Sequence, residues 1–361
     1  MVNPRCFEMF QMACGAKRTR ETYTQLLNLF LKWASKDYES LLVLTDFELQ
    51  ILLEDYMMYC RRRYATSSII TIFASIQKFL FVNDRTVNKK KLMMFLPEKL
   101  KTKQRAITIE EIRLLLKHCG SKRNRAIIHV FSATGCRPEA LADLKLKNIS
   151  EMPNGYTSVI FYAGTNNELQ HFYHPEVTSA VNDYLDERRQ EGEKLEPESY
   201  LFRQKRWLVD SESHLTLTGI ESIIDNLMKH AGIKRIKMND KRYDLPVCNG
   251  FRNRFNTILK RNSDISYPIA EQFLDHKLRM EPSYLFPTKE ELFDEYKKAV
   301  PELTISNEWK LKEELKRKNK ETESSKDKIS EELRSIKEDN ADMKERFASL
   351  EEIIKRLSEK D

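Results

Sequence analysis

The sequence TGCRPEAL runs from residue 134 to residue 141 and combines a turn, an arginine and the start of a helix. Gly135 predicts the turn, and Leu141 and Leu144 begin an apolar helical pattern just beyond it. Arg137 stands between the two. A single arginine after a glycine turn is usually structural, so its meaning depends on what else the chain contains.

Three further segments carry polar residues whose order along the chain is informative. They are NGFRNRFNT at residues 249–257, FLDHK at residues 273–277 and PSYLFP at residues 282–287. Arg252, His276 and Tyr284 follow Arg137 in this order, and Tyr284 stands eight residues after His276. Each residue alone is explained as a solvated or packing side chain, but their joint order and spacing argue against coincidence.

Together these segments resemble the tyrosine recombinase (phage integrase) family, and its archaeal members in particular. The family's T-G-x-R-x-x-E/A-L box matches at Arg137, and its H-x-x-R box matches at Arg252 with Asn249 in the histidine position. Its L-G-H box matches as LDH at residues 274–276, and PTKEELFDEY at residues 287–296 is also similar to the archaeal enzymes.

The resemblance implies that Tyr284 attacks a DNA phosphodiester and becomes a 3′-phosphotyrosine while the 5′-hydroxyl leaves. The guanidiniums of Arg137 and Arg252 can each fork onto the non-bridging oxygens of the more anionic transition state. His276 adds a hydrogen-bond donor. Because the bond energy is retained, no ATP, other cofactor or metal ion is expected.

Two other tyrosines compete for the role of nucleophile. Tyr267 precedes the His276 segment, against the order of the family. Tyr296 falls inside a helix that the capping box Thr288-x-x-Glu291 predicts, so we expect it to be a packing residue.

Two positions depart from the catalytic pattern of the family. Asn249 can donate a hydrogen bond to phosphate, but it cannot carry a positive charge or transfer a proton as histidine can. The hairpin lysine that is thought to protonate the leaving hydroxyl in the family aligns with Asn166, and residues 152–192 contain no lysine. We therefore expect a substitute such as Arg254 or Lys277, a slow enzyme, or a different alignment of the hairpin.

Hydropathy patterns divide the chain into four expected parts, and the resemblance covers about residues 105–305. They are a helical core-binding (SAM-like) DNA-binding domain at 1–96, a basic linker at 97–107, a catalytic domain at 108–305 and a coiled-coil tail at 306–361. Apolar residues recur at helical spacing over residues 19–34, 46–62 and 67–81. The catalytic domain is expected to be mostly α-helical with a small β-hairpin (α+β), its strands at 157–162 and 169–173.

Basic residues are concentrated before residue 306. The chain has 62 Lys+Arg against 55 Asp+Glu, a net charge of +7, whereas residues 306–361 hold 15 basic and 16 acidic side chains. Double-stranded DNA is therefore the expected partner, although a basic cluster can equally be an ordinary solvated surface. The candidate DNA-contacting residues are Lys17, Arg18, Arg20, Arg61, Arg62, Lys101, Lys103, Arg105 and Arg254.

The cysteines and the hydropathy argue against other classes of protein. None of the six cysteines belongs to a C-x-x-C pair, so neither a zinc site nor a disulfide framework is expected. A cytoplasmic, nucleoid-associated protein fits this usage. No apolar run approaches the roughly 18 residues that a membrane span needs.

Apolar residues of the tail alternate at spacings of four and three, as in a coiled coil. The a positions are Leu333, Asn340, Phe347 and Ile354, and the d positions are Ile329, Ile336, Met343, Leu350 and Leu357. Asn340 is the one polar member, a feature that favours a dimer in fixed register. The flanking g and e′ charges pair with opposite sign in a parallel homodimer, which is therefore expected; a single solvated helix is the alternative.

The expected function is site-specific DNA recombination or integration, with strand exchange through a Holliday junction by a tetramer on DNA. A type IB-like topoisomerase is an alternative that shares the Arg, Arg, His and Tyr chemistry but relaxes supercoils without pairing sites. A dimerising tail favours recombination, because strand exchange requires several protomers. A catalytically weakened DNA-binding protein is the second alternative, and it would form no covalent adduct with nicked DNA.

Overall fold

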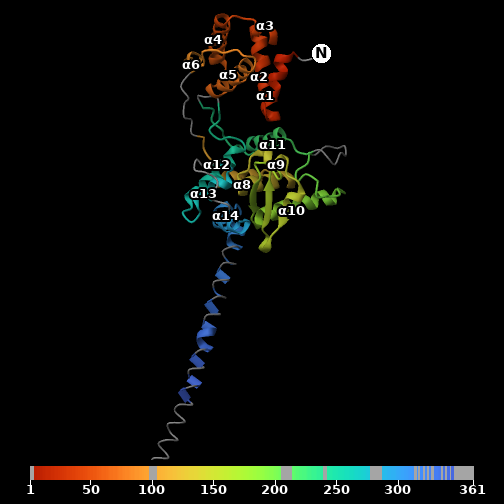
Figure 1. Cartoon of the computed structure of the whole chain (residues 1–361). Coiled ribbons are helices and arrows are strands. Elements are labelled where there is room, and N and C mark those ends of the chain that lie inside the picture. Colours follow the sequence, from red (N-terminus) through yellow and green to blue (C-terminus); the bar gives the residue numbers. More distant parts are fainter. Residues whose placement is uncertain are drawn as a thin grey trace, which may run out of the picture. The chain divides into compact units, whose positions relative to one another are not determined.

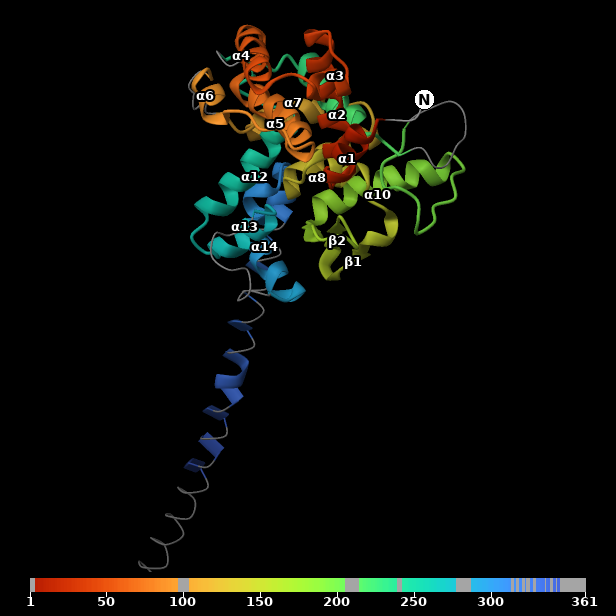
Figure 2. The ribbon, with the colours of Figure 1, turned by 45° about the horizontal axis from the view of Figure 1, so that its top comes forward.

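The computed structural model describes residues 4–96, 104–204, 214–238, 242–276 and 287–312, together with scattered helical residues between 315 and 344. The chain divides into two compact units: Met1–Lys103 with Ile236–Asp244, and Gln104–Arg235 with Leu245–Asp361. Figures 1 and 2 show the elements of both units in two views. No helix in the described ranges is long and apolar enough to cross a membrane.

The first unit is a bundle of helices around an aromatic core. Its helices are α1 (Arg5–Ala13), α2 (Lys17–Ala34), α3 (Tyr38–Leu42), α4 (Asp46–Arg63), α5 (Thr66–Val82) and α6 (Lys89–Met94). Trp33 of α2 packs against Tyr56 and Tyr59 of α4, with ring centroids 4.8 and 5.6 Å apart. The helical patterns predicted at 19–34, 46–62 and 67–81 are confirmed as α2, α4 and α5.

The second unit combines helices with one small sheet, so the predicted mostly helical fold with a small sheet is confirmed. Its elements are α7 (Ile109–Lys117), α8 (Lys122–Thr134), α9 (Pro138–Ala142), the 3-10 turns η1 (Leu146–Asn148) and η2 (Pro153–Gly155), β1 (Ile149–Glu151), β2 (Thr157–Phe161), β3 (Leu169–Tyr173), α10 (Pro175–Gln190), α11 (Leu217–His230), α12 (Asn249–Arg261), α13 (Tyr267–Phe273) and α14 (Lys289–Leu303). The strands are antiparallel in the order β1-β2-β3, with Val159 opposite both Ile149 and His171. The predicted hairpin is β2 and β3; β1 is an addition, and Tyr162 lies just beyond β2 with a φ of 53°.

Helix α8 is the central element of the second unit. All its residues from Ala126 to Thr134 are buried, which places neighbours on every side of the helix. It packs against α7, α10, α12, α14 and β3. A helix enclosed in this way has a fixed C-terminal end, and the TGCRPEAL segment begins there.

Residues 104–107, predicted as linker, are built into the second unit. Ile107 is 1% exposed, and its N–H donates to the carbonyl oxygen of Gly250 at 3.1 Å. Arg105 binds both carboxylate oxygens of Glu111 at 2.8 Å. A buried apolar side chain and a paired guanidinium thus hold this stretch, the C-terminal part of the predicted basic linker, against α7 and α12.

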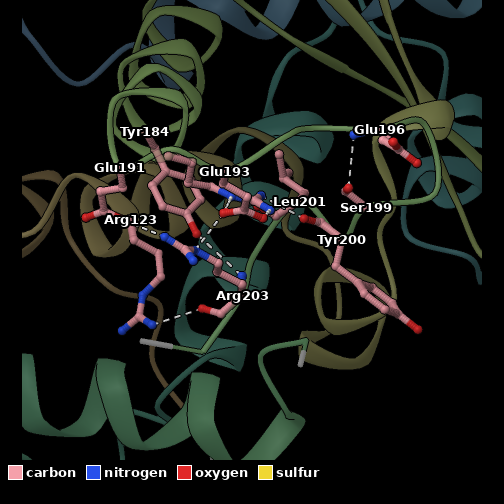
Figure 3. A network of polar contacts seen from close by, with 10 residues as sticks. Arg123, Tyr184, Glu191, Glu193, Glu196, Ser199, Tyr200, Leu201 and Arg203 are labelled. Atoms are coloured by element: carbon pink, nitrogen blue, oxygen red, sulfur yellow. Dashed lines mark hydrogen bonds and ion pairs between the residues drawn. The ribbon is translucent and has the colours of Figure 1, made fainter. Parts of the chain in front are cut away.

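A buried cluster of charges fixes the C-terminal end of α10. Arg188, whose side chain is 2% exposed, binds both carboxylate oxygens of Glu193. It also donates to the carbonyl oxygens of Tyr200 and Leu201 at 2.8 and 2.9 Å. Arg203 binds the same carboxylate at 2.9 Å (Figure 3). The buried charges of Arg188 and Glu193 are therefore paired, which is the arrangement that limits the cost of desolvating them.

Arg188→Ala should lower the free energy of unfolding by about 3–5 kcal/mol, because it removes the buried guanidinium paired with Glu193 and leaves two carbonyl groups without their donor. Urea unfolding of the whole chain measures this. Arg189→Ala is the matched control: its guanidinium is 57% exposed and pairs with the exposed carboxylate of Asp186, so its loss should stay below about 1 kcal/mol. Equal losses for the two variants would contradict a structural role for the cluster.

Candidate active site

The end of α8 sets the position of Arg137. Gly135 ends the helix with a φ of 55°, and a Cβ atom there would lie 2.7 Å from Cβ of Phe255 in α12. Both the left-handed conformation and the close approach of α12 therefore require glycine. Arg137 follows as the N-cap of α9, with Pro138 at the first helical position. The turn thus brings the Arg137 guanidinium to a partly exposed place beside α12.

Arg252 joins three segments of the second unit. It lies in the first turn of α12, where Nη1 donates to the carbonyl oxygen of Gly135 at 3.0 Å and Nη2 donates to that of Leu274. Burial lowers the pKa of Arg252, and the positive charge of Arg137 lowers it further, whereas Asp275 acts in the opposite direction. The two arginines therefore lie close enough to repel each other.

His276 is oriented by a carboxylate of α13. Its Nδ1 lies 2.7 Å from Oε2 of Glu271, and its backbone N–H donates to the carbonyl oxygen of Glu271 at 3.0 Å. Lys260 of α12 binds the other oxygen of that carboxylate. Although burial opposes ionisation of Glu271, the hydrogen bonds from Lys260 and His276 hold its pKa below the ordinary value. An imidazole bound through Nδ1 has Nε2 left to interact with a substrate.

Asp275 occupies the turn between α13 and His276. Its φ is 50°, and the N–H groups of Asp275 and His276 donate to the carbonyl oxygens of Gln272 and Glu271, which is a Schellman motif. Oδ2 of Asp275 lies 2.5 Å from Nη1 of Arg137, and the two side chains are 33% and 39% exposed. No local pattern in the sequence indicates this pair.

His171 of β3 supports the same turn from inside the unit. Its Nε2 lies 2.8 Å from the carbonyl oxygen of Phe273, and its ring packs against Phe255 and Phe273. Burial lowers the pKa of His171 to about 4. The imidazole is therefore neutral at pH 7, and its Nε2–H is the donor to the Phe273 carbonyl.

The structure brings Arg137, Arg252 and His276 together, as the family pattern suggests. Asn249 lies one turn before Arg252 on α12 and is exposed, and Asn166 is exposed in the β2–β3 turn. In the described ranges, no group of three or more His, Cys, Asp or Glu side chains is placed to hold a metal ion.

Arg254 is not part of this group. Its Nη2 donates to the carbonyl oxygen of Glu302 at 2.8 Å, which holds the C-terminal end of α14. Two residues beyond Arg252 on a helix, it faces another side. Arg254 therefore points away from Arg252 and holds α14, and it does not lie with Arg137, Arg252 and His276.

The remaining candidates fall into three sets. Tyr284, Lys277, Lys101, Lys103, Phe347 and Ile354 lie outside the described residues. Lys17, Arg18, Arg20, Arg61 and Arg62 are exposed at helix ends of the first unit, whereas Arg105 is paired with Glu111. Tyr296 is fully buried and donates to the carbonyl oxygen of Ala133 at 3.3 Å, which confirms it as a packing residue; Tyr267 is 59% exposed.

Comparison with known proteins finds one matching family model and several solved structures of similar fold. The model described as the phage integrase family matches residues 105–283. The chain is similar to lambda integrase (75–356) in a dimer bound to a COC′ core site, with 14% identity, a TM-score of 0.52 and coverage of 78% of this chain and 98% of that one. For a lambda integrase tetramer bound to a Holliday junction, the values are 13%, 0.51, 78% and 79%.

A XerA recombinase structure is also similar, with 19% identity, a TM-score of 0.38 and coverage of 81% of this chain and 98% of that one. No curated protein matches the sequence. At these identities the two lambda integrase structures show that the fold is shared.

Buried histidines should make the protein less stable in mild acid. Burial lowers the pKa of His129 and His171 to about 4 and that of His174 to about 3. The unfolded chain takes up these protons below about pH 6.5, whereas the folded chain does not. Stability is therefore complete above that pH and falls as the pH drops towards 4, by up to about 1.4 kcal/mol per pH unit for each histidine.

Urea unfolding between pH 6.5 and pH 5 (about the range in which only the unfolded chain titrates at these sites) measures this dependence. His171→Gln keeps a donor for the Phe273 carbonyl but cannot take up a proton. The slope of the free energy of unfolding against pH should therefore decrease by the contribution of one histidine. His118→Gln, at an exposed position, should leave the slope unchanged. An identical slope in wild type and His171→Gln would show that His171 does not stay neutral in the folded protein.

Proposed function

Because residues 105–283 of this chain belong to the phage integrase family, we propose that the protein is a site-specific DNA recombinase that cleaves and rejoins DNA through Tyr284. The observation that carries the proposal is the convergence of Arg137, Arg252 and His276 on one partly exposed site. These residues come from three segments that are far apart in the sequence, and each is held by contacts within the fold.

The proposed reaction is a balanced transesterification. Tyr284 loses its phenolic proton, its oxygen bonds to phosphorus, and the bond from phosphorus to the 5′ oxygen breaks, leaving a 3′-phosphotyrosine and a 5′-hydroxyl. Arg137 and Arg252 bind the non-bridging oxygens as negative charge develops, and His276 donates a further hydrogen bond. Attack by the 5′-hydroxyl of another strand reverses the steps and completes the exchange.

The proton for the leaving oxygen must come from a group other than a hairpin lysine, since residues 152–192 contain none. Arg254 is engaged with the Glu302 carbonyl. This leaves Lys277, next to His276 in sequence, as the proposed general acid. A positioned general acid typically contributes roughly 10²–10⁴-fold to the rate, so the choice has a large kinetic consequence.

We propose DNA as the partner and an oligomer on DNA as the working assembly. The lambda integrase structures with the same fold are a dimer on a COC′ core site and a tetramer on a Holliday junction. The exposed basic side chains of the first unit, Lys17, Arg18, Arg20, Arg61 and Arg62, are suited to phosphate contacts.

The tail is the proposed dimer contact. The described residues between 306 and 344 are helical, and Ile329, Leu333, Ile336 and Met343 each have more than half of their surface exposed. The start of the tail is fixed, because the buried carboxylate of Glu176 accepts from the N–H groups of Ile305 and Ser306 at 2.8 and 2.9 Å. A row of exposed apolar side chains at heptad spacing is stabilised by a second helix.

Covalent capture tests the proposed function. A pool of nicked duplexes with a randomised core should yield a protein–DNA adduct, visible by denaturing electrophoresis, with wild type and not with Tyr284→Phe. Arg137→Gln and Arg252→Gln should each slow adduct formation by about 10²–10³-fold, as for loss of one preorganised donor.

Tyr200→Phe, elsewhere in the second unit, is the control and should form the adduct at the rate of wild type. Absence of an adduct with wild type, despite binding to DNA, would instead establish the catalytically silent DNA-binding protein. An adduct that survives in Tyr284→Phe would assign the nucleophile to another residue.

Sedimentation of the full chain tests the tail. Leu333→Lys combined with Met343→Lys places charges in the a/d seam and should convert a dimer into a monomer, since apolar a and d residues hold the helices together. Ala341→Lys lies outside the seam on the same helix and should sediment as wild type does. A wild-type chain that stays monomeric at high micromolar concentration would contradict the proposed dimer.

A further inference from the structure

The ion pair between Asp275 and Arg137 places a negative charge where the proposed substrate carries one. Oδ2 of Asp275 and Nη1 of Arg137 are 2.5 Å apart, although 138 residues separate them in the sequence. Both side chains remain partly exposed, at 33% and 39%. The contact is therefore open to exchange with a ligand from solvent.

The turn itself does not need a carboxylate. Asp275 closes α13 through its backbone N–H and that of His276, and its left-handed φ of 50° is a conformation that glycine or asparagine adopts with least strain. A carboxylate just after the C-terminus of a helix also meets the negative end of the helix dipole. The charge of Asp275 is thus locally unfavourable, and its favourable partner is the arginine pair.

The arginines in turn gain from this charge. Burial lowers the pKa of Arg252 most, the repulsion from Arg137 lowers it further, and Asp275 acts in the opposite direction. A phosphodiester carries one negative charge and presents two oxygens to a guanidinium, as a carboxylate does. The carboxylate therefore has the charge and the acceptor oxygens of the group that the site is proposed to bind.

We propose that Asp275 is an internal stand-in for the scissile phosphate, which occupies Arg137 in the free protein and must leave when DNA binds. This inference rests on the proposed function of the site. The stand-in balances the two guanidiniums before DNA arrives, and the phosphate then competes with it for Arg137. Asp275 therefore attenuates both DNA binding and cleavage, so that only DNA held firmly by other contacts displaces it.

Asp275→Asn tests the stand-in. Asparagine keeps the shape and the left-handed turn but removes the charge. In a Tyr284→Phe background, which prevents covalent capture, fluorescence anisotropy with a labelled duplex should give a Kd about threefold to tenfold lower than for the parent. The slope of log Kd against log salt should steepen by about 0.9, because one negative charge no longer offsets a phosphate contact. The melting temperature of the free protein should fall.

Two further variants make the result specific. Asp294→Asn removes an equally negative but 66% exposed carboxylate from α14, and it should change the Kd far less than Asp275→Asn does. In an Arg137→Gln background, Asp275→Asn should have no effect on the Kd, because the guanidinium that it liberates is gone.

Tighter binding by Asp275→Asn that depends on Arg137 supports the stand-in. Binding that is unchanged, or no tighter than with Asp294→Asn, overturns it. Weaker binding also overturns it and shows that the carboxylate positions Arg137 for phosphate. If both wild type and Asp275→Asn fail to bind DNA, the proposed function fails as well. Unchanged or weaker binding by Asp275→Asn overturns the stand-in alone and leaves the proposed function intact.

Discussion

Arg252 donates to two carbonyl oxygens that belong to different parts of the second unit, Gly135 at the end of α8 and Leu274 at the end of α13. These carbonyls lie beside Arg137 and His276 in the chain, so one side chain fixes the separation of the other two. The arrangement depends on Gly135, because any side chain there would collide with Phe255 and separate α8 from α12. His171 adds a further contact to the same turn through the Phe273 carbonyl.

Charge balance is the second constraint on the site. Two guanidiniums held close together need a negative partner, and in the free protein the Asp275 carboxylate pairs with Arg137. The second carboxylate of the site, Glu271, binds Lys260 and His276. The proposed substrate supplies the same sign of charge. A site that is stable when empty and still binds phosphate must hold its own carboxylate weakly, and partial exposure of Asp275 meets that condition.

Local patterns in the sequence predicted much of this structure. The spacing of apolar residues predicted α2, α4 and α5, and the capping box at Thr288 marked the start of α14. Strand β1 has three residues, too few to show an alternating pattern. The Asp275–Arg137 and His171–Phe273 contacts join residues more than 100 positions apart, and nothing local indicates them. No local pattern indicates the Arg254–Glu302 contact either, because 48 residues separate the two. Glu271 stands only five residues before His276, so the sequence offered a signal for this hydrogen-bond partner.

The central claim is that Arg137, Arg252 and His276 surround a phosphate which Tyr284 attacks. A crystal structure of the protein on nicked DNA with orthovanadate, a mimic of the five-coordinate phosphorus, measures this directly. We expect vanadium to be bonded to the Tyr284 oxygen and nitrogen atoms of Arg137 and Arg252 to lie about 2.7–2.9 Å from vanadate oxygens. We also expect the Asp275 carboxylate to have left Arg137. Vanadate bound away from Tyr284, or an Arg137 still paired with Asp275 while the other residues hold the vanadate, would contradict these expectations.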